Sequence, residues 1–236
     1  AARTATKVPM ISLGTDGLTP EDGYAIQRAS IALRLSRGER QVGMKMGLTS
    51  RAKMEQVGVH QPIYGHLTDE MVVDDGGLIV FDNHCHPRVE PEICFRLARP
   101  LAGAVSAEEA LAACDGVCAA LEVIDSRYKD FKFTLSDVVA DNASSSKFAL
   151  GPWCDPSLDA GGLTMEMRAG DEVRVGSSDA ILDHPLNSLV AMAAQVPLKA
   201  GWVVMCGAST AAVHLCRGME VSLSVDGMSP VGFRVQ

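Results

Sequence analysis

The sequence predicts an α+β (mixed α/β) fold with a core rich in β-strands, and two observations support this prediction. Short runs of β-branched and other apolar residues recur between residues 78 and 225, separated by Gly, Pro, Asp and Asn. The second half of the chain has many such runs and only one strong helical segment. This distribution favours a mixed or antiparallel sheet over a regular alternation of parallel strands and helices.

The predicted helices begin at recognisable capping sequences. Thr19 can cap a helix that has Pro20 in its first position, and Asp22 stands where the acid of a capping box belongs. Ser106 and Glu109 form a second capping box. The predicted helical segments are residues 20–38, 106–117 and 186–196, with a helical turn at residues 49–54.

The predicted strands are short, and no Pro- or Gly-rich linker between them is long enough to separate domains. The chain also contains no internal repeat and no low-complexity tract, so we expect one continuous unit. The predicted strands cover residues 41–46, 78–81, 89–97, 120–124, 163–168, 173–175, 202–205 and 221–225.

Composition and charge argue against several classes of protein. Acidic residues number 29 against 21 basic ones, and no run of like charges provides a surface for nucleic acid. No apolar stretch approaches the roughly 20 residues that cross a bilayer, so no membrane partner is expected. Residues 1–7 lack the pattern of a signal peptide, and the seven cysteines are scattered, so we expect a cytoplasmic protein with reduced thiols.

Three glutamates form the most informative pattern in the chain. Glu90 and Glu92 lie two residues apart in a predicted strand, so their carboxylates point to one face, about 7 Å apart along the chain. Such like charges repel, and a divalent cation such as Mg²⁺ or Mn²⁺ removes the conflict. A Glu-x-Glu pair is most often a solvated face, but Glu122 stands among apolar residues, where a carboxylate needs a partner.

Five stretches of the chain carry a resemblance to a known family. In chain order, they are residues 43–50 (GMKMGLTS), 58–65 (GVHQPIYG), 87–92 (PRVEPE), 121–128 (LEVIDSRY) and 139–145 (VADNASS). Together they resemble the fumarylacetoacetate hydrolase superfamily, specifically its hydratase/decarboxylase branch from the meta-cleavage pathways of aromatic degradation. The resemblance extends over nearly the whole chain in the same order.

The resemblance implies a fold and a metal site. The fold is a fumarylacetoacetate hydrolase-like mixed β-sheet roll within a single catalytic domain, residues 1–236. A small N-terminal α/β lobe spans residues 1–75, and a β-rich metal-binding core spans residues 76–236. In the family, the acids that match Glu90, Glu92 and Glu122 bind Mg²⁺ or Mn²⁺, and the lysine that matches Lys45 lies at the active site. Homo-oligomers and complexes between the decarboxylase and its homologous hydratase are also implied.

Further polar residues are candidates for binding a small-molecule 2-oxo dicarboxylate substrate. Arg127 could pair with a substrate carboxylate because a guanidinium offers two parallel donors, and Arg88 is a second candidate for the same role. The polar segment at residues 141–145 lies at the site in the family. The predicted substrate-binding residues are Leu48, Thr49, Arg127, Asp141, Asn142, Ser144 and Thr210.

The branch contains two reaction classes, and one position favours the first of them. The hydratases have an acid where this chain has Ile63, and adding water to a diene requires such a proton-handling group. The resemblance therefore implies decarboxylation of 4-oxalocrotonate (2-oxohex-3-enedioate) to 2-hydroxypenta-2,4-dienoate and CO₂. The alternatives are 2-hydroxypenta-2,4-dienoate hydratase, an acylpyruvate hydrolase or oxaloacetate decarboxylase, and a non-catalytic subunit of a hydratase/decarboxylase complex.

Overall fold

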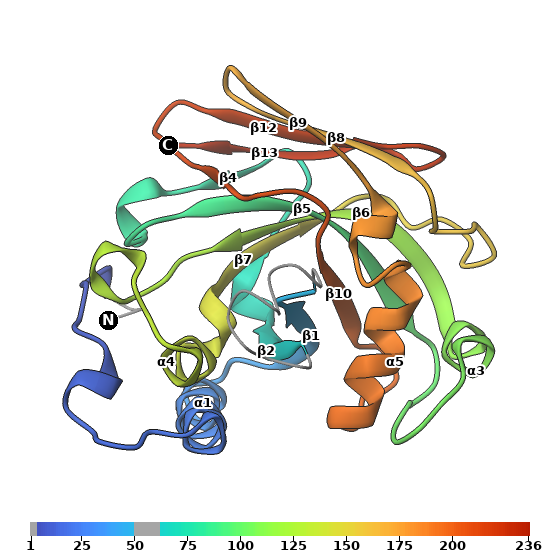
Figure 1. The fold of residues 1–236 in the computed structure, drawn as a ribbon. Coiled ribbons are helices and arrows are strands. Elements are labelled where there is room, and N and C mark those ends of the chain that lie inside the picture. The colour runs from blue at the N-terminus through green and yellow to red at the C-terminus, as the bar shows by residue number, and fades with distance from the viewer. Residues whose placement is uncertain (1–3, 50–61) are drawn as a thin grey trace.

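Two β-sheets form the body of the protein in a computed structural model that describes residues 4–49 and 62–236. The eight-stranded sheet has the order β2-β1-β10-β5-β6-β7-β3, with β11 paired to β5, and the five-stranded sheet has the order β4-β13-β12-β8-β9. Figure 1 shows the five-stranded sheet stacked on one side of the larger sheet, with the helices on the opposite side. The predicted mixed α/β class with a β-rich core is confirmed.

The elements have the following bounds. The strands of the larger sheet are β1 (Gln41–Gly47), β2 (Ile63–Thr68), β3 (Val72–Val73), β5 (Arg88–Leu97), β6 (Cys114–Ile124), β7 (Ser145–Leu150), β10 (Val203–Ala208) and β11 (Val213–His214). The strands of the smaller sheet are β4 (Gly77–Ile79), β8 (Thr164–Ala169), β9 (Glu172–Ser177), β12 (Glu220–Val225) and β13 (Val231–Val235). The helices are α1 (Pro20–Leu35), α3 (Ala107–Ala112), α4 (Leu135–Ala140) and α5 (Pro185–Gln195). The short 3-10 helices are η2 (Ile11–Leu13), η3 (Asp69–Met71), η4 (Phe81–Asn83), η5 (Lys129–Phe131), η6 (Asn142–Ser144) and η7 (Ser178–Ala180).

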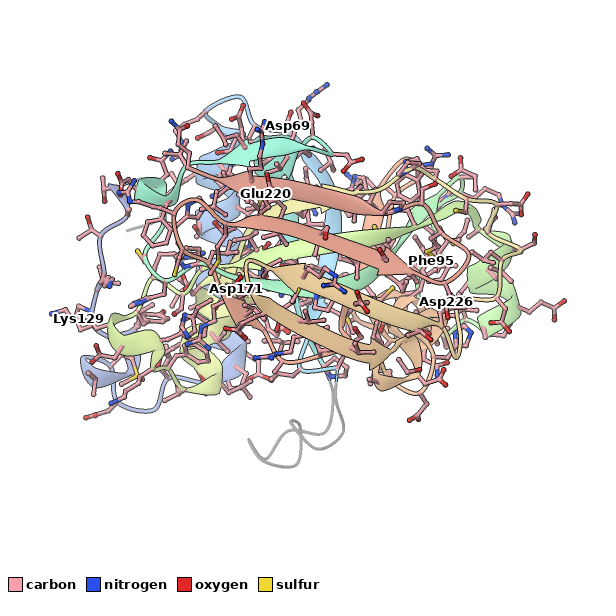
Figure 2. The ribbon with its side chains drawn as sticks, turned by 90° about the horizontal axis from the view of Figure 1, so that it is seen from above. Asp69, Phe95, Lys129, Asp171, Glu220 and Asp226 are labelled. Atoms are coloured by element: carbon pink, nitrogen blue, oxygen red, sulfur yellow. The ribbon has the colours of Figure 1, made fainter. Side chains whose placement is uncertain are left out.

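The main hydrophobic core lies between the two sheets. Figure 2 looks onto the outer face of the smaller sheet, with Asp171 and Asp226 near its two ends. Alternate residues of its strands are buried, as expected for a sheet with one solvated face. Core side chains from both sheets include Val89, Ile93, Val117, Leu121, Met165, Met167, Leu223 and Phe233.

The central strands β5 and β6 are buried on both faces, and this positions the functional site. They pair antiparallel along their length, and their odd-numbered residues face the five-stranded sheet. The even-numbered residues, Glu90, Glu92 and Glu122 among them, therefore point to the other side, where the helices lie (Figure 1).

The capping sequences are confirmed, but two predicted helices end too late. Thr19 and Ser106 both accept hydrogen bonds in complete capping boxes. Helix α1 ends at Leu35, and Gly38, with a φ of +101°, follows in the next turn. Helix α3 ends at Ala112 rather than near residue 117.

The second error has a tertiary cause. Residues from Cys114 onward pair with β5 and form the start of β6, so the strand pairing overrides the helical pattern. Gly116 permits this because a side chain there would come within 2.9 Å of the Trp153 ring. Cys114 and Cys118 are consequently strand residues in the core.

Several elements lack a prediction from the sequence. They include β2, β7, β13 and α4, although α4 has a capping box of Thr134 and Asp137. The predicted turn at residues 51–54 lies outside the described residues. Strands on both sides of residue 75 belong to the eight-stranded sheet, and the division into lobe and core stays a prediction. Among the described residues, no helix has the length and apolar character needed to cross a membrane.

Candidate metal and substrate site

Three carboxylates converge at the centre of the eight-stranded sheet. Glu90 and Glu92 project from β5, and Glu122 lies directly opposite Glu90 on β6. One oxygen from each of the three side chains lies within 4.8 Å of the others. Glu92 and Glu122 are both 0% exposed, which removes the stabilisation that water gives to a carboxylate.

A bulge in β10 fits the unusual sequence of β5. Pro91 has no N–H, and its carbonyl accepts from the Ser209 N–H, so the missing donor of Pro91 faces β10. The pairing of β10 with β5 shifts register between Met205 and Ala208 at this level. The bulged Gly207 has a φ of +101°, and its N–H donates to Glu92 Oε2 over 2.7 Å. The bulge thereby fixes the orientation of Glu92.

Lys45 completes this group of charges from the neighbouring strand β1. Its Nζ lies 2.9 Å from Glu122 Oε2 and donates to the carbonyl of Ala143 over 3.2 Å. Burial acts to lower the pKa of Lys45, but the nearby carboxylates outweigh it and raise that pKa. Burial and the charge of Glu122 raise the pKa of Glu92 well above its usual value.

The carboxylate group suits a divalent cation. Glu92 Oε1 and Glu122 Oε1 are buried and make no hydrogen bond within the described residues. Buried carboxylate oxygens without a partner are costly, and oxygen ligands are the ones that Mg²⁺ and Mn²⁺ prefer. Burial and the charge of Glu122 also disfavour a negative charge on Glu92, a conflict that a divalent ion would relieve. Glu90, Glu92 and Glu122 therefore fit such an ion by both donor type and charge.

A cavity of about 170 Å³ adjoins these charged groups. Lys45, Glu90, Leu48 and Ser144 line it, so four of the predicted site residues lie together. Most of the other lining residues are apolar, and they are Gly47, Ile63, Ile124, Phe131, Phe133, Thr134, Leu135, Val138 and Ala143. The site thus combines a charged floor with largely apolar walls.

Strained backbone presents one wall of this cavity. Asn142, Ala143 and Ser144 have φ values of +56°, +49° and +59°, three consecutive non-glycine residues in the left-handed region. This turn directs the Ala143 carbonyl to Lys45. It also leaves Ser144 Oγ buried beside the cavity, with no hydrogen-bond partner among the described residues. A substrate oxygen could supply that partner.

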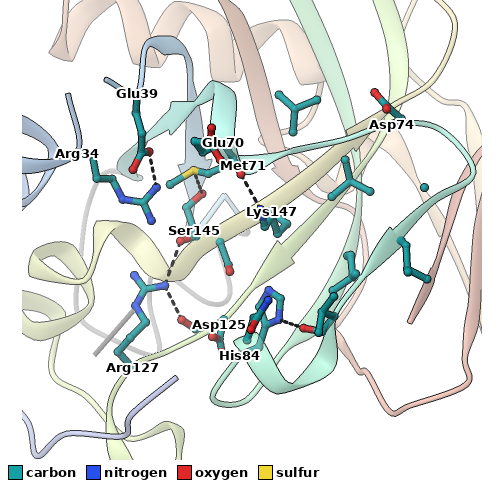
Figure 3. A pocket seen from close by; sticks show the side chains of 18 residues that line it. Arg34, Glu39, Glu70, Met71, Asp74, His84, Asp125, Arg127, Ser145 and Lys147 are labelled. Carbon is teal, nitrogen blue, oxygen red and sulfur yellow. Dashed lines mark hydrogen bonds and ion pairs between the residues drawn. The ribbon is translucent and has the colours of Figure 1, made fainter. Parts of the chain in front are cut away.

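Arg127, Asp141 and Asn142 do not line this cavity. The Arg127 guanidinium binds Asp141 and the carbonyls of Asp125 and Ser145, as Figure 3 shows in part. The Asn142 side chain bonds to both backbone groups of His66 on β2. Arg127 instead borders a separate polar cavity of about 590 Å³. The structure therefore gives these three side chains structural partners within the chain.

Two further predicted residues also lie off the cavity. Thr49 is buried beside the β10 bulge, where a side chain on Gly207 would collide with its hydroxyl group. Thr210 is half-buried, and its hydroxyl donates to the Ala211 carbonyl. Neither residue is among those that line the cavity of about 170 Å³.

The aromatic wall of the cavity is absent from the predicted site residues. Phe131 and Phe133 line the cavity just before α4. The capping box of Thr134 and Asp137 was the available signal, because it predicts that a helix begins there and holds the preceding segment in place. Which wall that segment forms depends on the tertiary structure.

Comparison with known proteins agrees with this architecture. The family model described as fumarylacetoacetate (FAA) hydrolase C-terminal matches residues 35–236. A 4-oxalocrotonate decarboxylase from a Pseudomonas species is 48% identical, with 99% of this chain and 93% of the relative covered. A 2-hydroxyhexa-2,4-dienoate hydratase from Comamonas testosteroni is 34% identical, with 97% and 90% covered.

A solved structure shares the whole fold. The structure of 4-oxalocrotonate decarboxylase from Pseudomonas putida G7, complexed with magnesium and adipate, matches with a TM-score of 0.96 at 36% identity. The match covers 100% of this chain and 93% of that one. These comparisons bear out the family that the sequence motifs indicated. The chain belongs to the fumarylacetoacetate hydrolase family.

Proposed function

We propose that this protein is a metal-dependent decarboxylase that converts 4-oxalocrotonate to 2-hydroxypenta-2,4-dienoate and CO₂. One observation carries the proposal: three converging carboxylates, two of them buried with unpartnered oxygens, lie next to Lys45 at the base of a small, largely apolar cavity. The relatives named 4-oxalocrotonate decarboxylase are 48% and 39% identical to this chain, which supports the same assignment.

The chemistry divides between a cation and the residues of the chain. Glu90, Glu92 and Glu122 would hold Mg²⁺ or Mn²⁺, which supplies a Lewis acid that stabilises negative charge on a 2-oxo acid. The substrate loses its C6 carboxylate when the C5–C6 bond breaks. The bonding electrons pass through the conjugated chain to the 2-oxo oxygen, and protonation of that oxygen gives the dienol.

Lys45 and Ser144 are the chain's own polar groups for this reaction. The Lys45 ammonium sits at the Glu122 end of the cavity, where it can donate a proton or a hydrogen bond to the developing oxyanion. Ser144 Oγ is an unpartnered hydroxyl on the same cavity and can orient a substrate oxygen. Both groups are fixed before substrate arrives, so little reorganisation accompanies the reaction.

The apolar walls favour loss of CO₂ over addition of water. Phe131, Phe133 and Val138 line the cavity, and their side chains offer no hydrogen-bonding group that would hold an ordered water. An apolar setting is more costly for a carboxylate than for neutral CO₂, so it assists the departure of charge from C6. Ile63 lines the same cavity, at the position where the hydratases carry an acid, and its side chain cannot hold or move a proton.

The test is a direct assay of both reactions. Purified protein is incubated with 4-oxalocrotonate in the presence of Mg²⁺ or of a chelator, and CO₂ release and dienol absorbance are followed. We expect CO₂ only with the metal, and we expect loss of CO₂ release in Lys45→Met. Hydration of 2-hydroxypenta-2,4-dienoate without CO₂ release from 4-oxalocrotonate would instead make the protein a hydratase. A chain inactive in both assays would be the non-catalytic subunit.

The assignment also includes proposals about assembly and location. The protein forms a homo-oligomer in the cytoplasm under this proposal. It also forms a complex with a homologous hydratase, because a hydratase can consume the dienoate product. Relatives at 34% and 35% identity are named 2-hydroxyhexa-2,4-dienoate hydratase and 2-keto-4-pentenoate hydratase. Size-exclusion chromatography with light scattering, with and without such a hydratase, would test both assemblies.

A further inference from the structure

We propose that Arg88 is a specificity-determining residue that binds the distal carboxylate of the dicarboxylate substrate. The inference rests on the proposed function for the identity of the substrate, and on the geometry of β5 for the residue. Arg88 begins β5 two residues before Glu90, so the two side chains leave the strand on the same face. Arg88 is therefore the next side chain outward from the carboxylate group.

The spacing along β5 matches the length of the substrate. Residues two apart on a strand are separated by about 7 Å. A six-carbon diacid in extended form spans roughly 6 Å between its carboxyl carbons, given carbon–carbon bonds of about 1.5 Å. Glu90 pairs with Glu122 across the sheet, and Arg88 pairs with Ile124, which lines the cavity. A substrate with its keto acid end at the first pair would reach the second pair with its other end.

Stacking on an aromatic ring holds the Arg88 guanidinium in place, and Glu90 is its charged neighbour on the same strand. The central carbon of the guanidinium lies 3.8 Å from the centroid of the Phe131 ring, and Phe131 lines the cavity. Stacking occupies a face of the guanidinium and leaves its in-plane N–H donors available. The Nε–H group is buried and has no hydrogen-bond partner within residues 4–49 and 62–236. Such a donor is suited to a carboxylate, which accepts two parallel hydrogen bonds.

Other arginines show how unusual this arrangement is. Arg96 lies on the same strand and also stacks on an aromatic ring, that of Trp153, at 4.8 Å. Its Nε, however, donates to Asp115 over 2.7 Å. Arg127 is likewise saturated by Asp141 and by main-chain carbonyls. In the described part of the chain, Arg88 combines a stacked guanidinium with a buried donor that nothing satisfies.

The backbone that carries Phe131 is itself strained. Asp130 and Phe131 have φ values of +59° and +56°, in the left-handed region that side chains disfavour. This turn places the Phe131 ring between Arg88 and Phe133, with an edge contact to His86. Because such strain persists only where the surrounding structure holds it, the aromatic platform under Arg88 is a fixed feature of the cavity.

Arg88 should contribute to recognition and not to the rate of bond cleavage. A guanidinium stabilises the charged carboxylate of the bound substrate, and that charge is lost as CO₂ departs. Removing the guanidinium should therefore raise KM by at least about tenfold and leave kcat unchanged or somewhat higher. A general structural defect would instead lower kcat and the melting temperature together.

The test compares Arg88→Met with the matched control Arg96→Met. Binding of hexanedioate (adipate) and of hexanoate to the Mg²⁺-loaded protein is measured by calorimetry, with thermal unfolding as a check on folding. We expect the wild type and Arg96→Met to prefer the diacid by at least about tenfold, and Arg88→Met to bind both acids equally. Equal preference in Arg88→Met and wild type would overturn the inference. If Arg88→Met does not fold, Arg88→Lys replaces it. We expect Arg88→Lys to lose part of the preference for the diacid, and full retention of that preference would contradict the inference.

The outcome separates this inference from the proposed function. If the wild type releases no CO₂ but loses its diacid preference in Arg88→Met, the role of Arg88 holds and the assigned reaction fails. If CO₂ is released and Arg88→Met keeps both the diacid preference and the wild-type KM, the reaction holds and the role of Arg88 fails.

Discussion

Two buried ion pairs in this protein have opposite characters. Arg127 and Asp141 are joined at 2.5 Å, and Lys45 and Glu122 at 2.9 Å, with all four side chains largely inaccessible to water. Around Arg127, the guanidinium and the carboxylate find partners in the surrounding loop. Around Lys45, two further carboxylates crowd the site, and the Oε1 atoms of Glu92 and Glu122 lack hydrogen-bond partners among the described residues.

The difference separates structural from functional polar groups. A buried pair with every group satisfied fixes the local chain and has no capacity left for a ligand. A buried group of like charges with unpartnered oxygens is unfavourable by itself and becomes favourable when a cation binds. The Arg127 pair therefore maintains the loop at residues 141–145, and the Lys45 group is where we propose that metal and substrate bind.

The largest expected effect is the loss of stability when the Arg127–Asp141 ion pair is broken. Arg127→Met would leave Asp141 buried without its cation, and we expect the free energy of unfolding to fall by about 3–5 kcal/mol. The affinity for Mg²⁺ should stay within about twofold of the wild type, because Arg127 does not touch the carboxylate group. Urea unfolding and calorimetry measure the two quantities. A large loss of Mg²⁺ affinity in the folded variant would show that the two pairs are coupled.

Glu92→Gln should have the opposite effects, with a small change in the free energy of unfolding and a large loss of Mg²⁺ affinity. Burial and the charge of Glu122 disfavour the charged form of Glu92, so a neutral amide at this position adds no unfavourable charge, and a glutamine keeps an oxygen for the Gly207 N–H. We expect the free energy of unfolding without metal to change by less than about 1 kcal/mol. Mg²⁺ affinity should fall more than about 100-fold, which abolishes the rise in melting temperature on adding Mg²⁺. A retained metal-dependent rise would remove Glu92 from the ligand set.

A half-buried histidine, His66 on β2, extends the comparison to the pH dependence of stability. Burial, with a smaller contribution from Arg28, lowers the pKa of His66 from 6.5 to about 4. Since the unfolded chain takes up the proton first, stability from this residue is complete above pH 6.5 and is lost as the pH falls toward 4. The loss should be about 2 kcal/mol between pH 7 and pH 4.5. The free energy of unfolding of His66→Gln, measured at both pH values, should lack this loss. The same pH dependence in His66→Gln and in the wild type would contradict the assignment of the loss to His66.

The smallest expected effect is at the cavity wall. Ile63→Asp places a carboxylate in the cavity that Glu90 also lines, and its repulsion of a dianionic substrate should raise KM by about tenfold, or about 1.4 kcal/mol. Ile63→Asn, of similar shape and no charge, is the control and should raise KM less. Steady-state kinetics with both variants tests whether charge at this position decides which substrate is accepted. Identical KM values in the two variants would argue that it does not.

Local sequence patterns predicted a large part of the fold and of the site. The capping boxes at Thr19 and Ser106 set helix starts because their hydrogen bonds close within four residues. The two-residue spacing of Glu90 and Glu92 places both on one face of a strand, whatever the strand pairs with. The family motifs indicated in addition that Glu122 and Lys45 lie at the same site as this pair.

Only the tertiary structure decided which polar groups are satisfied and which remain available. Cys114 became a strand residue because it pairs with Leu97, and Arg127 became structural because Asp141 lies within reach of its guanidinium. The bulge at Gly207 orients Glu92 across 115 residues of chain. Such partners are far apart in sequence and follow no local period, so their identity depends on how the sheets and loops pack together.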